Sequence, residues 1–234
     1  MTNEVALLIA AMLASGTPLA IAALGLLINE KVGVLNLGAE GMLLVGAVTG
    51  FAVAFHTHSV VLALLGGAAA AAVVAAVFGW LVIWINANQY ATGLAVSLFG
   101  GGFSAFVGVP YVGQKLGDPV SYAVPVLGDI PFIGPALFRQ HPMVYLTVLA
   151  VAAVAWFFYR TRAGLVLRAV GESPESAHAL GYKVRLLRLA AVLAGGGLCG
   201  VAGAYLSTVY TPLWVEGMVA GRGWIALALT VFAT

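Results

Sequence analysis

The chain has 234 residues, of which 62% are hydrophobic and only 8% are charged. A soluble domain normally carries about 25% charged residues, so this composition excludes an ordinary water-soluble domain. The formal net charge of +2 does not point to a partner, and no nucleic-acid partner is expected. Apolar runs close to or above the roughly 18 to 20 residues that cross a bilayer recur along the chain, without the ~10-residue alternating segments of a β-barrel. The sequence therefore predicts one all-α, polytopic membrane domain over residues 1–234.

Seven membrane-spanning helices are predicted, some of them broken or re-entrant. Short polar breaks separate the first four spans, and two long connections follow at residues 110–141 and 160–188. The first connection is rich in proline, which removes a backbone donor and fixes φ, so an irregular loop or a short re-entrant structure is expected there. The predicted spans are residues 5–28, 33–55, 59–85, 88–109, 142–159, 188–210 and 218–234.

The basic residues set the expected orientation. Residues 160–188 carry six Lys and Arg residues, and alternation of the spans places Lys31 on the same side. Because cytoplasmic loops of membrane proteins are enriched in Lys and Arg, this side is expected to be cytoplasmic. The 110–141 loop, the N-terminus and the remaining cations, which include Arg222, are then expected outside.

The cytoplasmic loop contains the pattern of a short, well-delimited helix. In "GESPESAHALGYK", residues 171–183, Ser173 is a good N-cap and Pro174 suits the first helical position. Glu175 suits the first turn, and Gly181 is a typical residue just past a helix end. A helix of about seven residues is marginal in water, so it must pack on something. The residues alone leave open whether it packs on the membrane domain or docks a partner.

Polar residues in apolar runs are the candidates for the substrate pathway. Asn36 and Glu40 are four residues apart and share a helix face, and Asn36 is expected to cap a half-helix that begins at Leu37. A carboxylate in lipid is unfavourable by a few kcal/mol, so Glu40 must face the bundle interior or a wet cavity. Two roles remain open for Glu40: a hydrogen-bonded tie to a neighbouring helix, or a lining of the path.

A second polar set lies at the start of the fourth span. Asn88 and Gln89 are expected to cap that helix or to lie at the interface, and Thr92, one turn further in, is expected to line the cavity. No set of residues has the spacing of a metal site or of a catalytic pair. The chain also lacks a P-loop, because the closest run, from Gly108, does not continue into Gly-Lys-Ser/Thr.

Several motifs together resemble one family. "AVGESPESAHALGYKV" resembles the cytoplasmic loop of permease subunits of ATP-binding-cassette importers, in the branch for nucleosides, simple sugars and branched-chain amino acids. "NEKVGVLNLGAEGMLLVGAVTG" is similar to the N-terminal signature of that branch in its nucleoside-type form. "LGDIPFIGPALF" resembles its external loop, and "GRGWIALAL" resembles a later segment.

The resemblance implies a specific assembly. Two permease chains, alike or different, form the pore, two ATPase subunits each receive a short coupling helix, and an extracytoplasmic binding protein delivers the substrate. The family has Asn where Ser173 stands and Ile where Tyr182 stands, and it continues for two more helices, so the chain is expected to be a shortened form. The resemblance places these residues on the coupling segment: Glu172, Ser173, Pro174, Glu175, Ala177 and Gly181.

We therefore expect a non-enzymatic permease of an ATP-driven nucleoside importer in the inner membrane of a bacterial cell. The chain is expected to hold no cofactor, since ATP would be bound and hydrolysed by the partner subunit. Three alternatives remain: the same machinery carrying simple sugars, the same machinery carrying branched-chain amino acids, and an ion-coupled carrier that uses Glu40 as a proton relay. An intramembrane enzyme is disfavoured, because every His lies at a boundary or in a loop.

Overall fold

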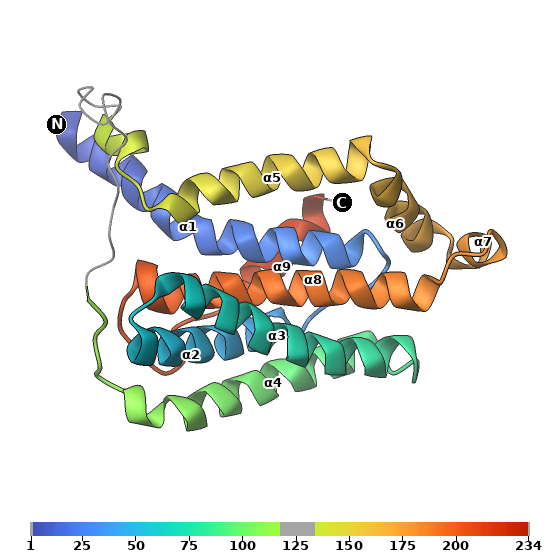
Figure 1. Ribbon diagram of the computed structural model, residues 1–234, viewed down its shortest axis with the longest axis horizontal. Helices are drawn as coiled ribbons and strands as arrows, with labels where there is room; N and C mark the ends of the chain where they lie inside the picture. Colours follow the sequence, from blue (N-terminus) through green and yellow to red (C-terminus); the bar gives the residue numbers. More distant parts are fainter. Residues whose placement is uncertain (1, 118–133, 234) are drawn as a thin grey trace.

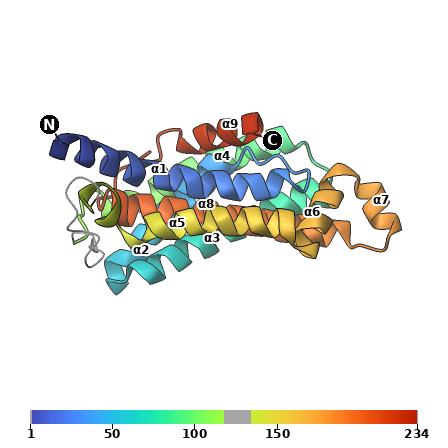
Figure 2. The same cartoon turned by 90° about the horizontal axis from the view of Figure 1, so that it is seen from above.

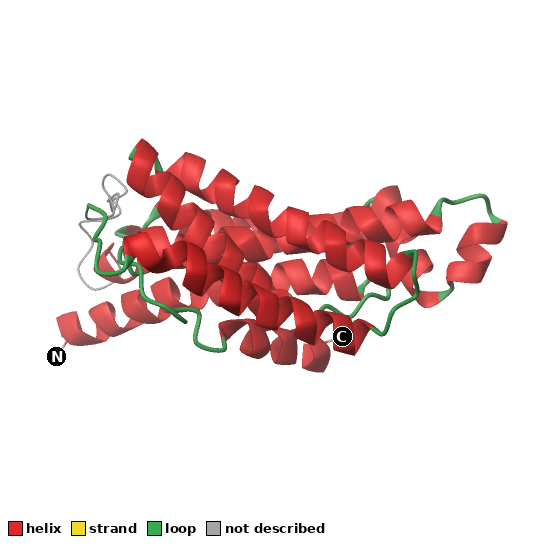
Figure 3. Ribbon diagram, turned by 90° about the horizontal axis from the view of Figure 1, so that it is seen from below, coloured by secondary structure: helices red, strands yellow, loops and turns green. Residues whose placement is uncertain are grey.

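The structure, a computed structural model, describes residues 2–117 and 134–233. Within these ranges it consists of helices joined by loops, without a strand (Figures 1 and 3), so the all-α prediction is confirmed. Three short helical segments are η1 (Val109–Tyr111), η3 (Gly134–Phe138) and η4 (Leu206–Tyr210). The α-helices are α1 (Thr2–Glu30), α2 (Ala39–Thr57), α3 (Val60–Ile83), α4 (Gln89–Gly108), α5 (Pro142–Arg160), α6 (Arg162–Glu172), α7 (Pro174–Ala179), α8 (Val184–Tyr205) and α9 (Arg222–Ala233).

Six helices in the described ranges are long and apolar enough to cross a membrane, which makes this a multi-pass membrane protein. They are α1, α2, α3, α4 with η1, α5, and α8 with η4. The seventh predicted span, 218–234, is instead the 12-residue helix α9, which begins at Arg222. The backbone explains the late start, because Gly217, Ala220 and Gly221 all have positive φ (68°, 50° and 83°) and cannot continue a helix.

The basic loop 160–188 contains more helix than expected. The short helix at 174–180 is confirmed as α7, but α6 before it was not predicted, and α8 begins at Val184 instead of 188. The start of α6 has a clear local cause: the Thr161 hydroxyl caps it by accepting from the Gly164 N–H at 3.0 Å. Of the expected outer loop 110–141, residues 118–133 lie outside the described part of the chain.

The helices form an elongated bundle around α8 (Figures 1 and 2). At one end α6 and α7 project beyond the other helices, and the N-terminus lies at the opposite end. The helix α9 begins partway along the bundle and packs against α1 and α2. Residues 31–38 precede α2 as turns and extended chain, so α2 also begins inside the bundle.

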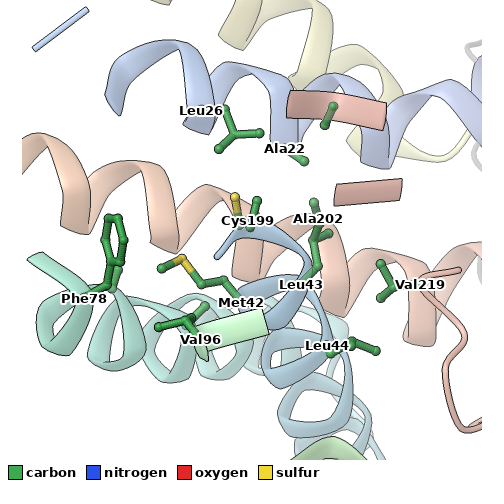
Figure 4. Close-up of a cluster of buried hydrophobic side chains, with 14 of the residues drawn as sticks. Ala22, Leu26, Met42, Leu43, Leu44, Phe78, Val96, Cys199, Ala202 and Val219 are labelled. Carbon is green, nitrogen blue, oxygen red and sulfur yellow. The ribbon is translucent and has the colours of Figure 1, made fainter. Parts of the chain in front are cut away.

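Glycines let three helices contact α8 backbone to backbone. A Cβ at Gly195 would lie 2.4 Å from the Gly25 oxygen of α1, and one at Gly200 would lie 2.2 Å from the Gly67 oxygen of α3. A Cβ at Gly203 would lie 2.0 Å from a carbonyl oxygen of α2. No larger residue fits at such contacts, which are typical of close helix packing in lipid. The buried apolar side chains around this contact, including Met42 and Cys199, come from α1, α2, α3, α4 and α8, together with Val219 from the segment before α9 (Figure 4).

Candidate translocation and coupling sites

Glu40 joins α2 to α9. Its Oε1 accepts a hydrogen bond from the Gly221 N–H at 2.8 Å, and its Oε2 accepts one from the Gly223 N–H at 2.7 Å. The first N–H groups of a helix have no partner within the helix, and they lie at the positive end of its dipole. Glu40 itself occupies the first turn of α2. Its carboxyl group therefore lies at the start of α2 and accepts hydrogen bonds from N–H groups at the start of α9. These contacts give a physical reason for a carboxyl group within an apolar segment.

The contact between Glu40 and α9 depends on glycine. A Cβ at Gly223 would lie 2.6 Å from both the backbone nitrogen and the Cα of Glu40. Such a distance is well inside van der Waals contact, so any side chain at this position would push α9 away from α2. The hydrogen bonds and the glycine therefore specify the same docking geometry.

Asn36 shapes the turn before α2 but does not cap a helix at Leu37. Its Oδ1 accepts from the Gly38 N–H at 3.0 Å, and its Nδ2 contacts the Met42 sulfur at 3.4 Å. The helix begins two residues later than expected, at Ala39, because Gly38 occupies the N-cap position. Asn36 is buried, with 1% of its surface exposed. A side chain that bonds the backbone N–H two residues later, as Asn36 does, is typical of Asn in turns and favours a turn over a helix at this point.

The start of α4 lies against this turn. The Asn88 side chain caps α4 by accepting from two backbone N–H groups of the first turn, at 2.9 and 3.1 Å, so its predicted capping role is confirmed. Gln89 reaches across to the other segment, where its Oε1 accepts from the Leu35 N–H at 2.7 Å. Thr92, one turn further along, is half-buried. The structure thus brings Gln89 to the segment that carries Asn36 and Glu40.

The rest of α4 continues this contact with α2. The Ser97 hydroxyl donates to the Leu37 carbonyl at 2.9 Å. A Cβ at Gly93 would lie 2.7 Å from the Leu37 Cβ, and one at Gly100 would lie 2.3 Å from the Gly41 Cα. The spacing of Gly93, Ser97 and Gly100 places them on one face of α4. Residues 35–41 are therefore held between the start of α9 and this face of α4.

Arg222 lies at the start of α9. Its expected place on the outer side stays a prediction, whereas in the bundle it stands between the two glycines whose N–H groups Glu40 binds. Its guanidinium group donates to the Met218 and Val219 carbonyls at 3.1 and 3.4 Å. It also lies 5.7 Å from the centre of the Tyr210 ring. These contacts compensate for a cation at a helix start, where the dipole is unfavourable.

The coupling segment has the caps that the sequence predicted. The Ser173 hydroxyl accepts from the Ser176 N–H at 3.4 Å, and Pro174 takes the first helical position. At the other end Gly181 has φ +86°, and the Tyr182 N–H bonds the Ala177 carbonyl at 3.2 Å. This is the glycine-based pattern that closes a helix C-terminus.

One side of α7 packs on α6, and the other side is exposed. Ala177 is buried, with 3% of its surface exposed, whereas Leu180 is 78% exposed. Ala177 and Leu180 also line a hollow of about 280 Å³ between the two helices, together with Leu165 and Ala169 of α6. Glu172 and Glu175 are exposed at the same end of the bundle. This end therefore presents apolar and acidic groups outward.

The coupling segment is also connected to the start of α2. A Cβ at Gly171, at the end of α6, would lie 2.3 Å from the Lys31 carbonyl oxygen in the turn after α1. In the same turn Gly33 has φ +77°, and the Arg188 Nε donates to the Val32 carbonyl at 3.0 Å. The turn that leads to Asn36 and Glu40 is thus held by both α6 and α8.

Comparison with known proteins identifies the family of the chain. Residues 8–234 match the family described as "Branched-chain amino acid transport system / permease component". The chain belongs to this family.

The permease is similar in sequence to several named permeases. Over 223 residues it is 44% identical to a putative glucose ABC transporter permease protein of Haloferax volcanii, covering 94% of this chain and 68% of the relative. It is 30% identical to a nucleoside ABC transporter permease protein of Lactococcus lactis, covering 98% and 76%. It is 29% identical to a guanosine ABC transporter permease protein of Bacillus subtilis, covering 97% and 75%. No solved structure matches the chain.

The permease is therefore a membrane-spanning subunit of an ATP-binding-cassette importer, a transport component that leaves ATP hydrolysis to a partner subunit. The family works in a membrane with ATPase and substrate-binding partners. Three residues with clear structural roles were not singled out from the sequence: Gly171, Arg188 and Gly223. Gly223 stands in the recognised motif "GRGWIALAL", so the motif was the available signal, but its partner Glu40 lies 183 residues away.

Proposed function

We propose that this permease transmits the work of a cassette ATPase through α7 and moves a neutral, hydroxyl-rich solute through the membrane. The observation that carries the coupling role is α7 itself, a six-residue helix closed by its own caps and projecting from one end of the bundle. A helix this short is not stable alone, and the exposed side chain of Leu180 at its end does not contribute to the stability of the chain in water. A partner that covers this residue would account for both features.

The contacts of α7 support a role in force transmission. Ala177 is buried between α7 and α6, and α6 meets the turn after α1 at Gly171. From this turn the chain passes directly to the segment held by Gln89 and by the start of α9. A displacement of α7 would therefore reach the start of α2 through packed contacts. Glu172, Ser173, Pro174, Glu175 and Gly181 define the exposed shape of this element.

A charge-insertion experiment tests the coupling role. We expect Leu180→Glu to abolish co-purification of the cognate cassette ATPase and ATP-dependent uptake, because it places a charge in the centre of the proposed contact. Val112→Glu is the matched control, since Val112 is 62% exposed at the opposite end of the bundle. If Leu180→Glu retains the ATPase and transports as the wild type does, α7 is not the docking element.

The polar side chains at the start of α4 support the proposed cargo. Amide and hydroxyl groups recognise neutral solutes with many donors and acceptors, and Asn88, Gln89 and Thr92 supply such groups at the start of α4. In this proposal Asn36 and Glu40 hold the wall of the path. A nucleoside is the cargo that the N-terminal signature favours, and two relatives are named for nucleoside or guanosine transport. A simple sugar is the second candidate, supported by the 44% identity to a putative glucose permease.

Uptake measurements separate the cargo candidates. Inner-membrane vesicles that contain the complete importer, with a second permease chain and the binding protein, would be loaded with ATP and offered labelled guanosine, glucose or leucine. ATP-dependent uptake of labelled guanosine that unlabelled guanosine reduces and unlabelled glucose does not would support the nucleoside. ATP-dependent uptake of labelled glucose that only unlabelled glucose reduces would support the sugar. Uptake driven by a proton gradient without ATP would overturn the proposed mechanism in favour of an ion-coupled carrier.

A further inference from the structure

A basic cavity opens beside α7, at the end of the bundle where α3 finishes and α8 begins. It has a volume of about 780 Å³ and is bounded by Trp84, α7 and the first residues of α8. Ile83 and Val184, which also line it, are the last residue of one membrane span and the first of another. The cavity therefore lies at the depth where a membrane helix meets the lipid headgroups.

Three cations line the cavity: Lys183, Arg185 and Arg188. Arg188 donates its Nε to the Val32 carbonyl, which leaves the other guanidinium N–H groups unused by that bond. In the described ranges the side chains of Lys183 and Arg185 have no hydrogen bond or ion pair. The opposing groups from α7 are one carboxylate, Glu175, and one imidazole, His178, so positive charge exceeds negative charge here.

The helix geometry adds to this positive potential. All three cations lie at or near the start of α8, whose N-cap Lys183 makes no side-chain capping bond. The start of a helix carries the positive end of the dipole, so cations there repel it unless an anion is present. Negatively charged groups, phosphates in particular, bind at such sites through N–H groups and neighbouring Lys and Arg side chains.

The apolar part of the lining distinguishes between sources of phosphate. Trp84, Ile83 and Leu186 lie beside the cations, and tryptophan is enriched at the headgroup level of membranes. A free phosphate ion would gain nothing from these residues, whereas a phospholipid would place its phosphate on the cations and its glycerol and chains against the apolar residues. We propose that this cavity binds the headgroup of an anionic phospholipid from the leaflet on the α7 side.

Lipid binding to the purified chain tests the proposal. The full chain, delipidated in mild detergent and without its ATPase, would be titrated with dioleoyl phosphatidylglycerol or with dioleoyl phosphatidylcholine, and bound lipid counted by native mass spectrometry. We expect the wild type to prefer one phosphatidylglycerol by about thirtyfold, and Lys183→Gln combined with Arg185→Gln to remove this preference. Arg160→Gln combined with Arg162→Gln is the matched control, since both cations are exposed at the same end outside the cavity.

Two other results would overturn the proposed lipid site. If both double variants lose the preference equally, general surface charge explains the binding and the site is overturned. If millimolar inorganic phosphate displaces phosphatidylglycerol completely and phosphatidylcholine binds as well as phosphatidylglycerol, the cavity binds free phosphate and the lipid proposal fails. Because no ATPase is present, these outcomes are independent of whether α7 docks one.

Discussion

Replacing Glu40 with glutamine should release α9 from α2. The carboxyl group accepts two backbone hydrogen bonds, at 2.8 and 2.7 Å, with no other acceptor for these N–H groups among the described contacts. Hydrogen bonds to charged groups contribute roughly 1.5–3 kcal/mol each. Glutamine keeps one oxygen, but its NH₂ group would face the second N–H, donor against donor. We therefore expect the docked position of α9 to lose about 2 kcal/mol, which is about thirtyfold in the undocking equilibrium.

The accessibility of a buried position on α9 measures this equilibrium. Thr230 is 5% exposed, and the only native cysteine, Cys199, is buried and can be replaced by alanine. In a Thr230→Cys background, Glu40→Gln should raise the rate of modification by a small membrane-permeant thiol reagent about thirtyfold. Glu216→Gln is the matched control, because Glu216 is exposed in the segment just before α9.

Two results would refute the reasoning in different ways. If Glu40→Gln leaves the modification rate unchanged but abolishes ATP-dependent uptake, the carboxyl group acts in the substrate path and not as a tie between helices. If neither quantity changes, the two hydrogen bonds contribute little to the folded chain. A raised modification rate together with loss of uptake, with the chain still inserted in the membrane, agrees with a structural tie on which transport depends.

Three further outcomes follow from the geometry. Gly223→Ala should raise the accessibility of α9 as Glu40→Gln does, because the new methyl group would lie 2.6 Å from the backbone of Glu40, whereas Gly102→Ala, with no atom within 4 Å, should have no effect. Gln89→Leu removes the acceptor of a partly buried N–H and should destabilise the detergent-solubilised chain by about 1 kcal/mol or more, measured by thermal unfolding. Burial lowers the pKa of His141 from its ordinary value of 6.5, so its neutral form is favoured in the folded chain. Stability should therefore fall as the pH drops below about 6.5 towards the folded-state pKa, and His141→Asn, which keeps a capping acceptor, should reduce this pH dependence in the same unfolding assay.

Much of the fold was predictable because membrane spans are long and locally encoded. The position of α7 followed from Ser173, Pro174 and Gly181, each of which acts on its neighbours in sequence. The helix α6 was missed because its 11 residues are too few for a membrane span and it lies among the arginines that marked residues 160–188 as a basic loop. The start of α9 was placed four residues too early because Gly217, Ala220 and Gly221 adopt positive φ before it, and a hydropathy pattern does not record backbone conformation.

The site was only partly predictable for the same reason. Sequence reasoning recognised that Glu40 needs a compensating environment, and it gave the capping role of Asn88. It could not identify the partner of Glu40, because the N–H groups that it binds belong to glycines without side chains, 181 and 183 residues away. The hydrogen bond from the Leu35 N–H to Gln89 likewise joins a backbone group to a distant side chain, and backbone partners leave no recognisable residue type in a sequence.

The glycine contacts along α8 have a mechanical consequence. At Gly67 and Gly203 the atoms that meet are backbone atoms and the small Cβ of Ala204, so a small shear at these two points displaces little side-chain volume. The contact between α2 and α9 is different, because two directed hydrogen bonds fix the position of the Glu40 carboxyl group against the start of α9. Directed hydrogen bonds from α4 also hold Leu35 and Leu37, so a small reorientation of the helices at the glycine contacts would leave residues 35–41 in place between α4 and α9.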